Sequence, residues 1–223
     1  LRKVSYELGV PLTSHGPYYI NLNAREQDKI DSSVERIIQT AKISDLCGAE
    51  SMTFHAAFYM KDSPYDVFDL VEKSMNVIEE RLNRLDIEIE LRPELTGKTS
   101  QFGSLEELIS LTKNVMSVKP CMDFSHLYAR TGKYNTYEEI KEVLDQLEVE
   151  LGADALKNMH IHVSGISSNS KGDLKHLNLE KSKFNWKAML QALKEKDCRG
   201  YMISNSPNLE DDALMLKEYY NAI

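Results

Sequence analysis

The sequence predicts an α/β protein with the architecture of a (β/α)8 barrel, the TIM-barrel type, and three observations support this. Six short apolar segments with the composition of strands alternate with segments of helical periodicity. Consecutive strand candidates begin roughly 33–41 residues apart, the length of a strand, a helix and two loops. The six histidines lie inside or just after these strands: His15, His55, His126, His160, His162 and His176. A barrel collects its active-site residues at such strand ends.

The predicted strands are Pro11–His15, Ser51–His55, Ile87–Leu91, Pro120–Phe124, Met159–Val163 and Gly200–Ser204. Apolar residues recur three and four positions apart in the helices, predicted at Asp31–Leu46, Val67–Leu85, Leu105–Met116, Tyr137–Glu150, Asn185–Glu195 and Glu210–Tyr220. A doubly wound open sheet is the alternative. It normally binds its ligand at one switch point beside a glycine-rich turn, and the sequence has neither GxGxxG nor a P-loop.

The first nine residues, Leu1–Gly9, have the pattern of the last turns of a helix that stops at glycine. A complete barrel has eight strands, and six are predicted here. We therefore expect a single partial barrel domain over residues 1–223 that lacks the first two βα units. Such a barrel would expose two sheet edges.

The composition favours a soluble globular protein, because 42% of the 223 residues are hydrophobic and 28% are charged. No apolar run reaches the roughly 20 residues that cross a bilayer, so no membrane association is expected. Three widely spaced cysteines fit reduced thiols in a cytoplasmic protein. The net charge of −8 argues mildly against a nucleic-acid partner, although bound divalent cations would restore positive charge locally.

Two sequence motifs place imidazole groups at strand ends. Asp123 and His126 stand three residues apart, and the alternative to a ligand pair is an aspartate that caps the next helix beside a solvent-facing histidine. His160 and His162 alternate on one strand, so both rings point to the same side. Here the alternative is a pair of hydrogen-bonded core histidines.

Further candidates follow the same logic. Glu88, Glu90, Arg92 and Glu94 share one strand face, where only Glu94 can reach the rim while Glu90 and Arg92 form a charge pair beneath it. The alternative is that all four line a solvated edge. Asp173 and His176 are predicted to lie in a polar loop rich in Ser, Asn and Gly, and the alternative to a ligand pair is that this loop is simply solvated.

Histidine and carboxylate ligands together suit zinc or manganese. The set exceeds what one tetrahedral ion can use, so it would suffice for two or three ions that share a bridging carboxylate. Clusters of this kind suit phosphoester hydrolysis.

The chain resembles endonuclease IV, the metal-dependent apurinic/apyrimidinic endonucleases of the xylose-isomerase-like superfamily, with the archaeal-type branch nearest. The matching stretches follow the family's order: His15–Leu22, Phe54–His55, Arg92–Gly97 with Gln101–Gly103, Asp123–His126, Met159–His162, His176–Leu179 and Ser206–Pro207.

The resemblance implies up to three zinc ions, with manganese as an alternative. His15 and His55 would hold the first ion, and Glu94 would bridge it to a second ion held by Asp123 and His160. A third would be held by His126, Asp173 and His176, and Tyr18 would press into DNA at the lesion. The implied reaction belongs to base excision repair: a metal hydroxide would cleave the phosphodiester 5′ to an abasic site and leave a 3′-hydroxyl. The full-length enzyme is expected to be a monomer.

Three departures from the family pattern stand out. Asn205 occupies the position of a metal-binding glutamate. The spacing around Glu94 is one residue shorter than in the better-known bacterial form, and that around Asp173 and His176 is one residue longer. The first two βα units are absent from the sequence. His162 is a candidate substitute ligand, and Asn205 is itself an additional candidate.

Two other functions stay open at this point. A single-metal sugar isomerase or epimerase of the same superfamily would use a Glu–Asp–His–Glu set on one ion, which leaves His15 and His55 unexplained. A non-catalytic relative that binds DNA or metal without hydrolysis would agree with Asn205.

Overall fold

The computed structural model describes residues 1–223 and divides into two compact units. Unit 1 comprises Leu1–Glu94 and Ser100–Pro120, and unit 2 comprises Leu95–Thr99 and Cys121–Ile223. The prediction of a single domain over 1–223 stays a prediction. None of the helices is long and apolar enough to cross a membrane.

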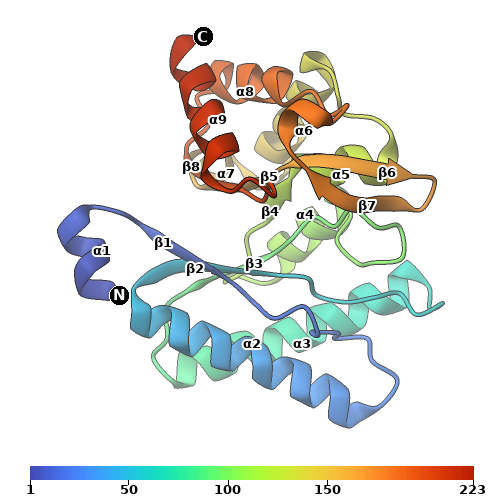
Figure 1. The fold of residues 1–223 in the computed structure, drawn as a ribbon. Helices are drawn as coiled ribbons and strands as arrows, with labels where there is room; N and C mark the ends of the chain where they lie inside the picture. The colour runs from blue at the N-terminus through green and yellow to red at the C-terminus, as the bar shows by residue number, and fades with distance from the viewer. The chain divides into compact units, whose positions relative to one another are not determined.

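Unit 1 is built on a three-stranded parallel sheet in the order β1-β2-β3, with α2 and α3 packed against each other on one face (Figure 1). Its elements in chain order are α1 (Arg2–Leu8), β1 (Leu12–His15), α2 (Gln27–Cys47), β2 (Ala49–Phe54), α3 (Pro64–Arg84), β3 (Glu90–Pro93) and α4 (Leu105–Asn114). The register pairs His15 with Thr53 and Phe54 with Pro93, so the three strands end together at one edge.

Local sequence signals define these helices. Ser63 caps α3 and accepts a hydrogen bond from the Asp66 amide, with Pro64 at the first helical position. Ser104 and Glu107 form a reciprocal capping box at the start of α4. As the opening residues predicted, α1 ends at Gly9, whose φ of 63° places it in the left-handed region.

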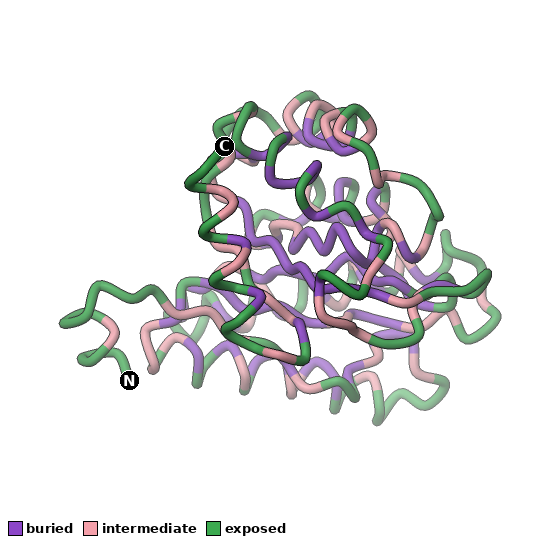
Figure 2. The backbone as a smooth tube through the Cα atoms, turned by 45° about the horizontal axis from the view of Figure 1, so that its top comes forward, coloured by how far each residue is buried: buried purple, intermediate pink, exposed green.

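Unit 2 contains a second parallel sheet in the order β4-β5-β8 and an antiparallel hairpin of β6 and β7. Its elements are β4 (Cys121–Asp123), α5 (Phe124–Thr131), α6 (Tyr137–Leu151), α7 (Asp154–Lys157), β5 (Met159–Val163), β6 (Gly165–Asn169), β7 (Gly172–Leu177), η1 (Leu179–Lys181), α8 (Trp186–Glu195), β8 (Gly200–Ser204) and α9 (Glu210–Ala222). Figure 2 shows buried residues concentrated along the strands and on the inner faces of the helices, whereas α1 buries none.

All six predicted strands and all six predicted helices are confirmed, with shifted ends. The third strand lies at Glu90–Pro93 rather than Ile87–Leu91, because pairing with β2 begins at Glu90. The prediction that Asp173 and His176 lie in a loop is wrong, since both are on β7. The sequence pattern did not predict the β6–β7 hairpin, because its mostly polar residues show no alternation of apolar and polar side chains.

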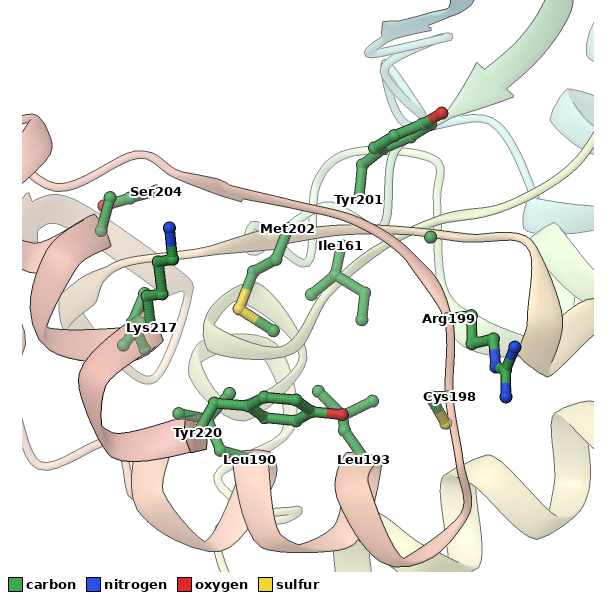
Figure 3. A pocket seen from close by; sticks show the side chains of 13 residues that line it. Ile161, Leu190, Leu193, Cys198, Arg199, Tyr201, Met202, Ser204, Lys217 and Tyr220 are labelled. Atoms are coloured by element: carbon green, nitrogen blue, oxygen red, sulfur yellow. The ribbon is translucent and has the colours of Figure 1, made fainter. Parts of the chain in front are cut away.

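The side of β8 that faces the helices contains a cavity of about 520 Å³ (Figure 3). Ile161 and Met202 project into it from the strands, and Leu190, Leu193 and Tyr220 line it from α8 and α9. Because successive residues of a strand point to opposite faces, His160 and His162 project from the other face of β5. The cavity therefore contains none of the predicted metal ligands.

Candidate metal-binding sites

Three predicted ligands of unit 1 converge at the end of its sheet. His15 is the last residue of β1, His55 directly follows β2, and Glu94 directly follows β3. Because the three parallel strands end in register, their final side chains meet at the same edge. The candidate ligand atoms of these residues all lie within 4.8 Å of one another.

The two imidazoles approach the same carboxylate oxygen. His15 Nε2 lies 3.0 Å and His55 Nε2 lies 3.2 Å from Glu94 Oε2. Tetrahedral ligands of one zinc ion at bond lengths near 2.0–2.2 Å are separated by about 3.3–3.6 Å, so the two contacts are within a few tenths of an ångström of a coordination shell. Glu94 is only 2% exposed, and a carboxylate buried to that extent requires cationic or hydrogen-bonding partners.

The tautomer of His15 strengthens this interpretation. Its Nδ1 lies 2.7 Å from the carbonyl oxygen of Gly16, which can only accept, so Nδ1 carries a proton. In the neutral ring, Nε2 then presents a lone pair to the lone pairs of Glu94. That contact is favourable only when the ring is protonated or both atoms coordinate one cation. The donor set therefore fits a divalent metal ion.

Tyr18 lies beside this group and remains accessible. Its ring centroid is 5.2 Å from that of His15 and 5.7 Å from that of His55, and the residue is 73% exposed. An exposed aromatic side chain thus stands next to the candidate metal site, and its contact with DNA stays a prediction.

Beneath the rim, Arg92 and Glu90 form the predicted charge pair. Arg92 Nε donates to Glu90 Oε2 at 3.0 Å, and Arg92 is buried with 1% exposure. A second guanidinium nitrogen donates to the carbonyl of Pro120 at 3.2 Å. The pair fixes the strand that carries Glu94.

In unit 2, His126 and His176 face each other through their Nε2 atoms, which are 3.3 Å apart. His126 Nδ1 donates to the carbonyl of Leu95 at 3.1 Å, and His176 Nδ1 donates to the carbonyl of Asn205 at 3.0 Å. Both Nε2 atoms are therefore acceptors in the neutral rings, and two facing acceptors repel unless a proton or a cation lies between them. Backbone carbonyls that orient histidines in this way are typical of metal sites.

The strand β7 has a β-bulge next to Asp173. Ser167 pairs with Lys175 while Ser168 pairs with Asp173, so β7 has one extra residue, Leu174, at this point. Such a bulge changes the alternation of the strand between Asp173 and His176. The Asp173 side chain packs against Gly97, and its ligand atoms join those of His126 and His176 in no compact group of three. Its role as a ligand stays a prediction.

Asp123 combines the capping and the ligand interpretations. It accepts a hydrogen bond from the His126 amide at 2.8 Å as the N-cap of α5, yet His126 is buried rather than solvent-facing. Its second oxygen, Oδ2, is buried, accepts no hydrogen bond and lies 3.3 Å from His126 Nδ1. A buried carboxylate oxygen without a hydrogen bond is costly, and a cation would satisfy it.

His160 and His162 lie on the same side of β5, as the alternation predicted, with ring centroids 5.1 Å apart. Both are buried, at 1% and 4% exposure. The ligand atoms of this pair and the Cys121 thiol lie within 4.8 Å of one another. Sequence reasoning gave Cys121 no role, although its position two residues before Asp123 places it on the same strand face.

Asn205 acts through its main chain. Its amide donates to the Val163 carbonyl at 2.8 Å, which continues the pairing of β8 with β5. Its carbonyl holds His176, as described above. Neither interaction depends on the side chain, so asparagine at this position keeps the orientation of His176.

Comparison with known proteins places these residues in a family. Residues 1–219 match the model of the xylose isomerase-like TIM barrel family. An uncharacterized protein of Methanocaldococcus jannaschii is 41% identical over 219 residues, which cover 98% of this chain and 80% of that protein. A probable endonuclease 4 of Aster yellows witches'-broom phytoplasma is 25% identical over 186 residues, and the match spans 82% of this chain but only 62% of the relative.

Two solved structures share the fold. Endonuclease IV from Thermus thermophilus superimposes with a TM-score of 0.72 at 22% identity, covering 100% of this chain and 80% of that one. A D-tagatose 3-epimerase-like protein gives a TM-score of 0.75 at 17% identity, with coverage of 99% and 79%. The chain therefore belongs to the xylose isomerase-like TIM barrel family, as its motifs predicted, and endonuclease 4 proteins are among its relatives.

Proposed function

We propose that this chain is an endonuclease IV-like hydrolase that cleaves the phosphodiester 5′ to abasic sites in DNA and depends on zinc or manganese. One observation carries the proposal: His15 and His55 converge on the buried carboxylate of Glu94, with Tyr18 exposed beside them. A single-metal epimerase gives the two histidines no task. A multi-metal phosphodiesterase uses both as ligands.

The proposal assigns each residue a task. His15, His55 and Glu94 would hold one ion, and Asp123 and His160 would hold a second, to which Glu94 would be the shared carboxylate. His126 and His176 would hold a third, with Asp173 as the remaining ligand. When bound, divalent ions of this kind neutralise phosphate oxygens and make water a better nucleophile at neutral pH.

The protein's own groups orient these ligands and contact the substrate. The carbonyls of Gly16, Leu95 and Asn205 fix three imidazole rings through Nδ1, so Nε2 is the coordinating atom and no ring must reorient when an ion enters. Tyr18 offers an exposed aromatic face, which can stack in the gap left by a missing base. Bound divalent ions would also offset the net charge of −8 where the phosphate backbone approaches.

The test is incision of a duplex that contains one abasic site, by chain freed of metal and then reloaded with zinc or manganese. We expect a cut 5′ to the lesion that leaves a 3′-hydroxyl, which a polymerase can extend. An uncut duplex after reloading would refute the proposal. Turnover of a ketose with one bound ion per chain would favour the epimerase.

Tyr18 and Tyr19 provide a matched pair of variants. Both are exposed, at 73% and 71%, but Tyr19 packs under Arg36 at 5.2 Å from its ring centroid, whereas Tyr18 packs beside the histidines. We expect Tyr18→Ala to weaken binding of abasic duplex about tenfold or more, because a stacked aromatic contributes about 1–3 kcal/mol. Tyr19→Ala should leave binding nearly unchanged. Equal effects of the two variants would remove Tyr18 from the proposed site.

A further inference from the structure

Four side chains with ligand chemistry form a compact block on one face of the paired strands β4 and β5. The register sets Cys121 opposite His160 and Asp123 opposite His162. Because residues two apart on a strand share a face, all four project to the same side. The candidate ligand atoms of Cys121, His160 and His162 lie within 4.8 Å of one another.

We propose that Cys121, His160 and His162 form a thiolate–bis-imidazole site for zinc or a similarly thiophilic ion. The proposal rests on the proposed function in one respect: the ion is the one assigned above to Asp123 and His160, because a neutral imidazole coordinates a single ion. It assigns ligand roles to the Cys121 thiolate and to His162, and it applies whether or not the chain cleaves DNA.

The geometry requires only a small contraction. Zinc bonds of about 2.3 Å to sulfur and about 2.0–2.1 Å to nitrogen place tetrahedral ligands about 3.4–3.6 Å apart. Atoms now within 4.8 Å of one another would therefore close by up to about 1.4 Å, which rotation about the side-chain bonds can provide. These three ligands leave a position on the zinc ion for the Asp123 carboxylate, which lies on the same strand face.

Burial and charge favour a thiophilic ion at this place. Cys121 is 0% exposed, His160 1% and His162 4%, so a bound ion would exchange little with water. Thiolate and imidazole donors together select zinc over magnesium or calcium, which prefer oxygen. A thiolate would offset one of the two charges of the ion, and the neighbouring Asp123, also fully buried, carries a further carboxylate on the same face.

Cobalt(II) replaces zinc in such sites and gives an intense near-ultraviolet charge-transfer band when a thiolate binds it. The experiment starts from a Cys47→Ser/Cys198→Ser chain, in which Cys121 is the single thiol. Cys47 ends α2 in unit 1, and Cys198 lines the cavity on the helix-facing side of β8, so neither belongs to the proposed set.

We expect this chain to bind cobalt with the charge-transfer band, and Cys121→Ser in the same background to lose the band together with at least tenfold in affinity at that site. Cobalt binding without the band in the single-thiol chain would overturn the proposal. So would an unchanged affinity in the Cys121→Ser chain.

A second measurement needs no substitution at Cys121. Zinc X-ray absorption of the single-thiol chain should show a sulfur neighbour at about 2.3 Å alongside nitrogen and oxygen neighbours. A shell of nitrogen and oxygen alone would contradict the proposal. Incision of abasic DNA is assayed on the same samples, so a missing sulfur ligand and a missing nuclease activity are recognised separately.

Discussion

The substitution Gly97→Ala tests whether Asp173 of the β6–β7 hairpin packs directly against Gly97, in the segment that follows β3. A methyl group at this position would stand 2.6 Å from Asp173 Oδ1 and 2.9 Å from both Cβ and Cγ of Asp173. The backbone of Gly97 does not adopt a positive φ, so alanine itself is conformationally acceptable there. The whole penalty therefore comes from the Asp173 side chain, whose Cβ is fixed to the strand and cannot rotate away.

The expected magnitude follows from two opposing effects. Overpacking by one methyl group costs about 1–3 kcal/mol, whereas replacing glycine by alanine gains about 0.4–1 kcal/mol by restricting the unfolded chain. The net loss should be about 1–2 kcal/mol. For a chain of this size, that corresponds to a fall in Tm of roughly 2–8 °C.

A double-mutant cycle with Asp173→Gly measures the clash directly by thermal unfolding. In the Asp173→Gly background, Gly97→Ala should be neutral or slightly stabilising, because the three clashing atoms are gone. Gly132→Ala is the control: Gly132 has a φ of 68° and nothing within 4 Å, so its substitution should cost stability without coupling to Asp173. An equal cost of Gly97→Ala in both backgrounds would refute the packing argument.

Three further predictions concern individual side chains. Glu94→Gln should weaken zinc binding at least tenfold in titration calorimetry, because it removes the one charged ligand of the His15–His55–Glu94 group. An unchanged zinc affinity would exclude that group as a metal site. Burial opposes ionisation of Asp212, but the neighbouring Ser206 hydroxyl and hydrogen bonds from Asn208 and the Leu179 amide prevail and hold its pKa below the usual range. Its contribution to stability is therefore complete above about pH 4 and is lost as the pH falls through the lowered pKa. Between pH 5 and pH 3, the Tm of the parent chain should fall further than the Tm of Asp212→Asn. Equal falls in Tm would contradict this. Burial raises the pKa of the Cys198 thiol to about 11, so the folded chain should resist alkylation at this residue at pH 8, and rapid labelling there would show that the thiol is accessible.

The strands were predictable because each is a short apolar run bounded by polar residues, and parallel strands place successive ends at one edge. That rule alone brought His15, His55 and Glu94 together correctly. The alternation rule likewise predicted that His160 and His162 share a face. Both are consequences of backbone geometry, which the local sequence specifies.

Other features depend on contacts between residues far apart in the sequence. The bulge at Leu174 is set by the pairing of β6 with β7, and the local sequence Asp173–His176 does not predict it. Asn205 holds His176 through a backbone carbonyl, an interaction that no side chain in the sequence can reveal. Cys121 has no cysteine or histidine at a ligand-like spacing on its own strand, and its neighbours His160 and His162 come from the adjacent strand.

The number of zinc ions per folded chain, determined by elemental analysis after dialysis against metal-free buffer, tests the proposed multi-metal centre most directly. The account predicts three ions. One should be lost in His15→Ala/His55→Ala and another in His126→Ala/His176→Ala, with both variants folded by circular dichroism. A single ion per chain, retained in either double variant, would contradict the account.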